Sequence, residues 1–451
     1  MLQRAAALRV QPTVLGIAAI TAVALGLRLF WVFYTDSVAA GGDPHWYLVA
    51  GINLAKGFGY VAARDSHLYE IVGPGEPTAY WPPGYPFALA AAFKLFGVSA
   101  VHAKAMNAVL GAATVPFVYG LGAALFDRRA GIASAVIYTL IPSAIVWTPV
   151  LFPEPLFTLL FIAALWLLVV RAPASRPWLP AAAFGLLAGM AVLTRGEGVV
   201  LVPVAIAYWL ATSGWRSAAR NSAVALAVAI GVIAPWTVRN AVELHAFIPV
   251  STNAASVLRA GHSPDATGYT LWTKDQVDGF SMEQSLYQPD REVKGYRTYT
   301  SRAIDYAFTH PMRELQLSGL KLYHTFRSDA GMMPWLTTLG TTPLHPAGLR
   351  DALWYLLTYS YYTLFFATVL SVPFWLRRAP ARILIGSVLV FWSLFHMVFT
   401  GDVRYHIPLL PLFAIATAGG ASMAIEQTRG AFARLRAGRY TEPATLDAPI
   451  V

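Results

Sequence analysis

Two acidic residues stand beside prolines in separate polar segments, and each has the chemistry of a base or a metal ligand. Asp43 lies in residues 41–47, Gly-Gly-Asp-Pro-His-Trp-Tyr, and Glu154 lies between two prolines in residues 152–156. The glycines and the proline predict an irregular turn that holds Asp43 in place. A carboxylate held in this way can act as a general base, or bind a divalent cation together with His45 or Glu154. The alternatives are a solvated turn for Asp43 and a helix-capping role for Glu154.

Three arginines are candidates for binding phosphate. Arg195 lies two residues before Glu197, and Arg404 lies two residues after Asp402. An arginine between apolar segments needs an anionic partner, and the neighbouring acid is one choice. The phosphate of a lipid head group is the other, because the planar guanidinium group matches phosphate geometry. Arg239, which ends an apolar stretch, is the third candidate.

The composition is that of a membrane protein. The chain is 57% hydrophobic and 12% charged, with a mean hydropathy of +0.53, whereas a soluble domain is about 25% charged. The absence of cysteine excludes a disulfide framework and a thiolate metal site. The net charge of +10 lies mainly in short loops, which is a topology signal of membrane proteins. We therefore expect no nucleic-acid partner.

About ten apolar stretches are long enough to cross the hydrocarbon core, which takes about 20 residues. They cover residues 12–34, 103–125, 131–151, 155–170, 178–194, 198–213, 221–238, 352–376, 383–400 and 407–425. Their near lack of ionisable residues argues against an ion pathway. Only His396 lies well inside a span, and Arg28 is expected to snorkel towards the outer end of the first span.

Arginines predict the orientation, because they accumulate in cytoplasmic loops. The segments placed inside carry Arg4, Arg9, Arg128, Arg129, Arg171, Arg176, Arg216, Arg220, Arg377, Arg378 and Arg382, followed by Arg429, Arg434, Arg436 and Arg439. Both termini are then cytoplasmic, and Asp43 and Glu154 lie on the outer face. Residues 37–39 resemble a cleavage site, but the first span is too long for a signal peptide and is expected to be an uncleaved anchor.

Two outer segments, residues 35–102 and 239–350, are too long to be simple connections. In the first, residues 84–96 are apolar but too short for a span, which predicts an amphipathic helix in the membrane interface. In the second, residues 292–308 and 312–326 have helical patterns. We expect these helices to form a small extracytoplasmic cap on the bundle.

The expected domain organisation is a transmembrane module over residues 1–430 and a disordered cytoplasmic tail over residues 431–451. Within the module, Gly185 and Gly189 form one small-residue motif that predicts close helix packing. There is no Walker loop, no HExxH and no CxxC motif, and the histidines are too scattered for a zinc site.

The order of these motifs resembles that of the C-type (GT-C) membrane glycosyltransferases. The nearest branch is similar to the protein O-mannosyltransferases and the bacterial aminoarabinose transferase of lipid A. The resemblance runs from Leu27 to about Leu412, over residues 27–29, 42–47, 80–86, 152–156, 193–198, 235–240, 247–253 and 404–408. At residue 81 this chain has Trp, where members of the branch often have Lys.

The resemblance implies that a sugar moves, with inversion, from a polyprenyl-phosphate donor to an acceptor hydroxyl on a lipid, glycan or protein. It implies Asp43 as base, Glu154 as a second catalytic candidate, and Arg195, Arg404 and Arg239 as ligands of the donor phosphate. Substrate contacts are expected from His45, Tyr47, Trp81, Tyr85, Glu197 and Tyr405. No cofactor is required, although Asp43 and Glu154 leave open a divalent metal. The site would face outward from a bacterial inner membrane.

Two other classes of function remain open from the sequence. A transporter or flippase of lipid-linked sugars would suit a polytopic chain, but its usual sign, paired broken helices in two matching halves, is missing from the sequence. A membrane scaffold without catalytic activity is the third reading, and inactive Asp43 variants that assemble normally would disfavour it.

Overall fold

The computed structural model describes residues 12–35, 42–62, 75–169, 178–271, 289–337 and 347–438. Several features named above lie outside the described residues. They are the cleavage-like residues 37–39, the predicted tail beyond residue 438, and Arg4, Arg9, Arg171, Arg176 and Arg439.

The described part of the chain is a helical bundle, and seven of its helices are long and apolar enough to cross a membrane. They are α1 (Pro12–Tyr34), α4 (Ala100–Leu125), η1 with α9 (Gly196–Val200, Leu201–Ser213), α10 (Trp215–Glu243), α17 (Ala347–Trp375), α18 (Ala379–Val398) and η3 with α19 (Val403–Leu409, Leu410–Gly438). Two further predicted spans are the shorter apolar helices α7 (Glu154–Val169) and α8 (Leu179–Thr194). The prediction of an all-α polytopic membrane protein is confirmed.

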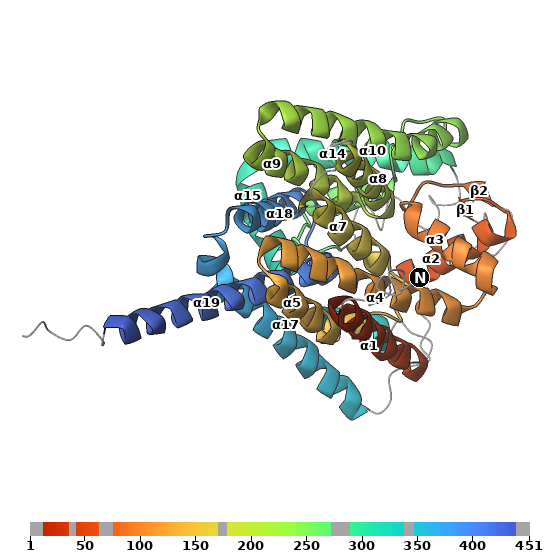
Figure 1. The fold of residues 1–451 in the computed structure, drawn as a ribbon. Helices are drawn as coiled ribbons and strands as arrows, with labels where there is room; N and C mark the ends of the chain where they lie inside the picture. Colours follow the sequence, from red (N-terminus) through yellow and green to blue (C-terminus); the bar gives the residue numbers. More distant parts are fainter. Residues whose placement is uncertain are drawn as a thin grey trace, which may run out of the picture.

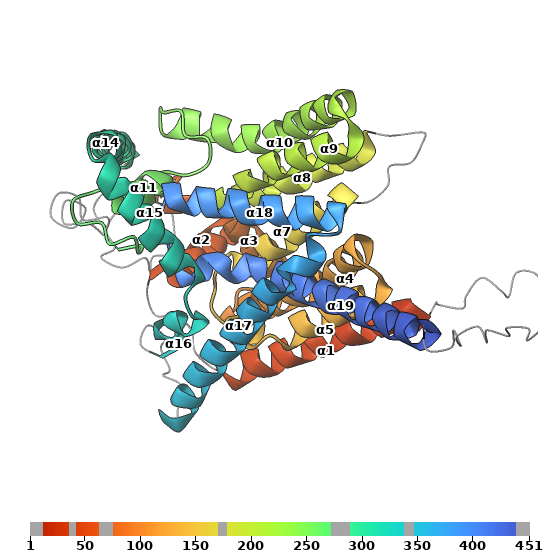
Figure 2. The same ribbon diagram turned by 90° about the vertical axis from the view of Figure 1, so that its left-hand side faces the viewer.

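The helices are arranged in layers. Helices α8, α9 and α10 cover one side, α7 and α18 lie beneath them, and α1, α5 (Arg128–Leu140) and α17 lie on the far side (Figures 1 and 2). A continuous hydrophobic core fills the bundle, with Phe157, Phe161 and Trp392 at its centre. This core fixes the ends of α7, α8 and α18, which meet at the site described below.

The single span predicted over residues 131–151 is wrong. Helix α5 ends at Leu140, a short helix α6 (Pro142–Val146) follows, and the chain then runs without regular helix to Glu154. Pro142 explains the break, because proline has no N–H to donate and clashes with the preceding helical turn. After the break, the acidic start of α7 lies buried inside the bundle.

The outer segments form a cap at one end of the bundle, as Figure 2 shows for α11 (Asn253–Gly261), α14 (Pro289–Thr309), α15 (Pro311–Phe326) and α16 (Pro334–Thr337). The other outer elements are α2 (Gly42–Lys56), α3 (Gly84–Phe96), η2 (Asp329–Met332) and a two-stranded antiparallel sheet of β1 (Val61–Ala62) and β2 (Glu76–Pro77). The helix predicted over residues 84–96 and the two predicted in the cap are all present.

Two sequence expectations need correction at the ends of spans. Helix α19 continues to Gly438, so the boundary predicted at residue 430 falls inside a helix. Arg28 does not snorkel, because its side chain is completely buried in the bundle against Gly111. A Cβ at residue 111 would lie 2.6 Å from Arg28 Nε, which explains the glycine there.

The contact between α8 and α10 is close, as the small-residue motif predicts. A Cβ on Gly189 would lie 2.8 Å from Cβ of Val232, and a Cβ on Gly185 would clash with the backbone of Ala225. We expect Gly185→Ala to destabilise the fold by about 1–3 kcal/mol, because overpacking forces backbones apart. Thermal unfolding of the purified protein measures this effect.

Gly231→Ala in α10 is the matched control for that prediction. A Cβ on Gly231 meets nothing within 4 Å, and alanine is the better helix former by about 1 kcal/mol. The control should therefore keep or raise the melting temperature. Equal melting temperatures for the two variants would show that the α8–α10 contact is looser than described.

The predicted orientation is also testable in this cysteine-free chain. Ser217 lies near the start of α10 and Ser251 lies beyond its end, so about 40 Å of helix separates them at 1.5 Å per residue. Single cysteines at the two positions should react with an impermeant thiol reagent from opposite sides of the membrane. Labelling of both from outside intact cells would refute the topology.

Candidate active site

Asp43 lies at the start of helix α2 rather than in an irregular turn. Gly42 begins the helix with a φ of +69°, a conformation that glycine adopts without strain. Asp43 is therefore in the first turn, where the helix dipole favours an acid. Its side chain keeps 25% of its surface exposed, so a substrate has access to it.

Arg404 binds Asp43. Its Nη1 donates to Asp43 Oδ2 at 2.9 Å, and the arginine side chain keeps 13% of its surface exposed. The neighbouring acid, Asp402, is not its ion-pair partner, because Asp402 instead caps η3 by accepting from the Arg404 backbone N–H at 3.2 Å. Arg404 Nε has no hydrogen-bond partner among the described residues.

Arg195 lies between two buried acids, where α8 ends and η1 begins. Its guanidinium group pairs with Glu154 at the start of α7 and with Glu197 in η1. Burial alone would lower the pKa of Arg195, but Glu154 and Glu197 outweigh that effect and raise it. The arginine is therefore firmly charged. The sequence named Glu197 as one partner, and the structure adds Glu154.

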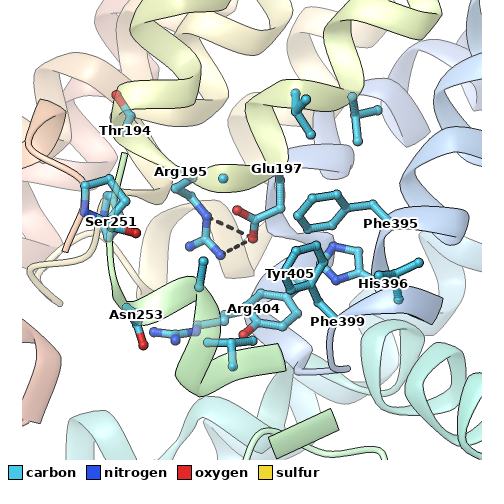
Figure 3. Close-up of a pocket in the computed structure, with 18 of the residues that line it drawn as sticks. Thr194, Arg195, Glu197, Ser251, Asn253, Phe395, His396, Phe399, Arg404 and Tyr405 are labelled. Carbon is cyan, nitrogen blue, oxygen red and sulfur yellow. Dashed lines mark hydrogen bonds and ion pairs between the residues drawn. The ribbon is translucent and has the colours of Figure 1, made fainter. Parts of the chain in front are cut away.

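The aromatic ring of Tyr405 contacts both Arg195 and Arg404. The guanidinium carbon of Arg195 lies 5.4 Å from the ring centre and that of Arg404 lies 5.6 Å from it. His396 stacks on the same ring at 4.8 Å. Figure 3 shows these side chains converging, His396 from α18, Arg404 and Tyr405 from η3, and Arg195 from the junction between α8 and η1. Cation–π contacts of this kind hold guanidinium groups in place without using up their N–H donors.

A cavity of about 590 Å³ opens beside these residues. Its polar end is lined by Arg195, Glu197, Arg404 and Tyr405, with Tyr47 and Trp81 on a neighbouring wall. Its other end is an apolar slot between α9 and α18, formed by Val199, Val200, Pro203, Phe391, Leu394, Phe395, Val398 and Phe399. Val199, Leu394 and Val398 are each about half exposed, so the slot opens on the lipid-facing surface of the bundle.

The aromatic wall of the cavity is uncharged. Tyr47 and Trp81 lie with ring centres 5.4 Å apart. Burial, with a further contribution from Asp43, raises the pKa of the Tyr47 phenol well above its usual value. Tyr47 therefore stays protonated and can donate a hydrogen bond.

The cavity does not include every predicted site residue. Asp43 and Glu154 do not line it. Each instead forms an ion pair with an arginine that does, Asp43 with Arg404 and Glu154 with Arg195. His45, Tyr85 and Arg239 do not line it. Tyr85 is buried and donates to Asn107 at 3.0 Å, so it serves the packing of α3 on α4.

Arg239 holds the outer cap and lies away from the cavity. It donates to the carbonyl groups of Thr78 at 2.7 Å and Tyr60 at 2.8 Å. Glu292 in α14 fixes the same loop by accepting from Thr78, Ala79 and Thr252. Nothing in the sequence distinguishes this arginine from Arg195 and Arg404, because all three lie next to apolar stretches.

Other residues of the cavity were missed by the sequence reasoning. Ser251 and Asn253 line it from the cap, and His396 contacts Tyr405. The apolar slot had a detectable signal, since Phe391, Phe395 and Phe399 recur every four residues: the first two share one face of α18, and Phe399 directly follows its end. A stripe of this kind is also what ordinary helix packing produces.

Both candidate catalytic acids are paired with arginine. Asp43 and Glu154 each pair with a different arginine, and no group of three His, Asp or Glu side chains gathers anywhere in the described residues. A guanidinium group competes with a cation for the same carboxylate oxygens. The arrangement therefore suits an anionic ligand more than a cationic one.

Comparisons with known proteins agree with the fold. The family model described as dolichyl-phosphate-mannose-protein mannosyltransferase matches residues 81–238. No curated protein matches the sequence. The archaeal oligosaccharyltransferase AglB from Archaeoglobus fulgidus, in complex with an inhibitory peptide and a dolichol-phosphate, is similar in structure. Its TM-score is 0.55 at 14% identity, over 96% of this chain and 52% of that one.

Two further solved structures are similar. The Archaeoglobus fulgidus oligosaccharyltransferase in complex with Zn and sulfate has a TM-score of 0.53 at 16% identity, over 95% of this chain and 52% of that one. ArnT from Cupriavidus metallidurans bound to undecaprenyl phosphate has a TM-score of 0.45 at 14% identity, over 95% of this chain and 81% of that one. This chain spans about half the length of the oligosaccharyltransferases that it matches.

Proposed function

We propose that this multi-pass membrane protein, which has the fold of the GT-C glycosyltransferases, transfers a sugar from a polyprenyl-phosphate donor to an acceptor hydroxyl. The observation that carries the proposal is the cavity, which joins an apolar slot open to lipid with a pair of arginines. A polyprenyl-phosphate sugar has the matching parts: a long apolar chain, one phosphate and a polar ring. The description of the matching family names dolichyl phosphate, and the AglB structure is a complex with a dolichol-phosphate, which supports this donor class.

The donor would bind with its chain in the slot between α9 and α18 and its phosphate at Arg195 and Arg404. The Arg404 side chain keeps 13% of its surface exposed while its Nη1 holds Asp43, so the exposed part of the guanidinium group could contact the phosphate. The sugar ring would then lie against Tyr47 and Trp81. Aromatic rings bind the apolar faces of sugars well, because they cover C–H groups that water solvates poorly.

The proposed reaction is a single displacement. Asp43 takes the proton of the acceptor hydroxyl as the oxygen attacks the anomeric carbon from the side opposite the phosphate. The bond between that carbon and the phosphate oxygen breaks, and polyprenyl phosphate leaves with the electron pair. Arg195 and Arg404 stabilise the charge that develops on the leaving group. The transition state resembles an oxocarbenium ion, as in glycoside hydrolysis, and the configuration inverts.

The remaining site residues support this chemistry. Glu154 and Glu197 hold Arg195 in place, and Glu154 is the alternative base if Asp43 has another role. We place the site on the extracytoplasmic face of a bacterial inner membrane, on the strength of the arginine-rich loops predicted for the opposite face. The acceptor class is a lipid, glycan or protein hydroxyl. No step in this scheme needs a metal.

The direct test is transfer by the purified protein. The protein is incubated with a panel of radiolabelled polyprenyl-phosphate hexoses and pentoses and with membrane extract as the source of acceptor. The wild-type protein should transfer the labelled sugar of one donor to an acceptor and release polyprenyl phosphate. The Asp43→Asn protein should not transfer the label. Movement of intact donor across proteoliposome membranes without release would instead identify a flippase. Binding of a donor with neither outcome would contradict the proposal.

A further inference from the structure

Arg28 is a buried charge without an acidic partner among the described residues. It lies in α1 with none of its surface exposed. Its Nη1 donates to the Ala24 carbonyl oxygen at 3.1 Å, and the ring of Tyr138 lies 5.4 Å from the guanidinium carbon. Its Nε and Nη2 have no hydrogen-bond partner within the described residues. Tyr138 also interacts with this cation, but buried N–H groups left without hydrogen bonds are unfavourable, so the arrangement calls for a further partner.

A second cavity supplies the space for that ligand. It has a volume of about 40 Å³ and lies inside the bundle beneath the active site. Arg28 and Glu154 both line it, together with Trp147. Glu154 Oε2 and Trp147 Nε1 also have no hydrogen-bond partner in the described part of the chain. Residues that line the cavity therefore carry unpaired donors, on Arg28 and Trp147, and an unpaired acceptor, on Glu154.

Water fits this cavity best. A water molecule needs about 10–15 Å³ of cavity volume and two to four polar partners, so the space holds about three waters. An anion would satisfy Arg28 but would meet the carboxylate of Glu154. A cation would satisfy Glu154 but would meet the guanidinium group. Water alone both donates to Glu154 and accepts from Arg28.

We propose that the cavity holds a cluster of water molecules that joins Arg28 to Glu154, and that Arg28 is a positioning residue of the active site. Glu154 uses Oε1 to hold Arg195, and the water cluster would engage Oε2. Fixing both oxygens fixes the rotation of the carboxylate, and so the place of Arg195 at the cavity mouth. The water cluster is independent of the proposed function, whereas its effect on transfer rests on that function.

The first experiment detects the water without any substrate. X-ray radiolysis in ¹⁸O-labelled water generates hydroxyl radicals from bound water, which oxidise the side chains next to it. Met332 and Trp147 line the cavity and are 2% and 6% exposed, so their modification needs internal water. Trp392 is the matched control, because it is 1% exposed and lies among Phe157 and Phe161 outside the cavity.

We expect Met332 and Trp147 to be oxidised at least severalfold faster than Trp392. We also expect Thr158→Leu, which fills the cavity from its wall, to abolish that difference. Oxidation of Met332 and Trp147 as slow as that of Trp392 would show a dry cavity and overturn the proposal, whatever reaction the protein catalyses.

The second experiment tests the positioning role through a double-mutant cycle. Arg28→Met and Glu154→Gln should each slow transfer by about 10-fold or more, as loss of a charge-assisted contact implies. The double variant should be no slower than the slower single variant, because both act through one link. Arg28→Lys should restore part of the rate, since it returns the charge to the cavity.

If the rate reductions caused by Arg28→Met and Glu154→Gln multiply in the double variant, the two residues act independently and the positioning role is wrong. A failure of Arg28→Lys to exceed the rate of Arg28→Met, when both proteins are folded, would also overturn that role. Arg216→Met is the control, because this arginine is exposed at the start of α10 and contacts Trp215. Where Arg28→Met does not fold, Thr158→Leu gives the same information: it should slow transfer if the water positions Glu154, and unchanged transfer would refute that role.

Discussion

Replacing Asp43 with asparagine is expected to slow sugar transfer by about 10²–10⁴-fold, because a positioned general base contributes that much. Asparagine keeps the shape of the side chain and can still accept a hydrogen bond from Arg404, as Asp43 does at 2.9 Å. It removes only the charge and the ability to take the acceptor proton. Expression and donor binding should persist, so the loss should appear in kcat. Radiolabel transfer under saturating donor measures it.

Asp305→Asn is the matched control for this variant, because Asp305 is an exposed acid in α14 of the same cap. It should leave transfer unchanged. A metal ligand at residue 43 would produce a similar loss, so the wild-type protein must also be assayed with chelator. Inhibition by chelator would assign Asp43 to a metal. Near-normal transfer by Asp43→Asn would exclude it from catalysis and make Glu154 the leading base.

Replacing Arg404 with alanine is expected to weaken binding of the polyprenyl-phosphate donor by about 10- to 150-fold. That range corresponds to the 1.5–3 kcal/mol typical of a hydrogen bond to a charged group. Arg195→Ala should weaken binding at least as much and should also lower the melting temperature. It leaves Glu154 and Glu197 buried without their cation, and an uncompensated buried charge destabilises strongly. Equilibrium binding of labelled donor in nanodiscs measures both variants.

Arg239→Ala provides the comparison that only the structure suggests. All three arginines are equivalent phosphate candidates in the sequence, but Arg239 holds the carbonyl groups of Thr78 and Tyr60. Folded Arg239→Ala protein should therefore keep its donor affinity. Unchanged affinity in folded Arg404→Ala and Arg195→Ala proteins would remove both arginines from the donor site. A loss confined to Arg239→Ala would place the phosphate under the cap.

The sequence by itself determined the class of the fold and most of the helices. Apolar stretches of about 20 residues have few alternatives to helix in a bilayer, because every backbone group must be satisfied internally. That argument holds residue by residue along the chain, which is why α1, α4 and α18 were predicted closely. It fails where a local breaker acts, as Pro142 does in ending α5 early.

The tertiary structure decided which of the candidate residues share a site. Asp43 and Arg404 are 361 positions apart, and Arg195 and Glu154 are 41 apart. Spacing within one helix cannot specify such pairs, because they depend on how separate helices pack. The same limit applies to Arg28, which the sequence placed at the membrane surface because long arginine side chains usually reach water. Gly111 on the neighbouring α4 leaves room for its guanidinium group instead, and only helix packing brings that group to the cavity below Glu154.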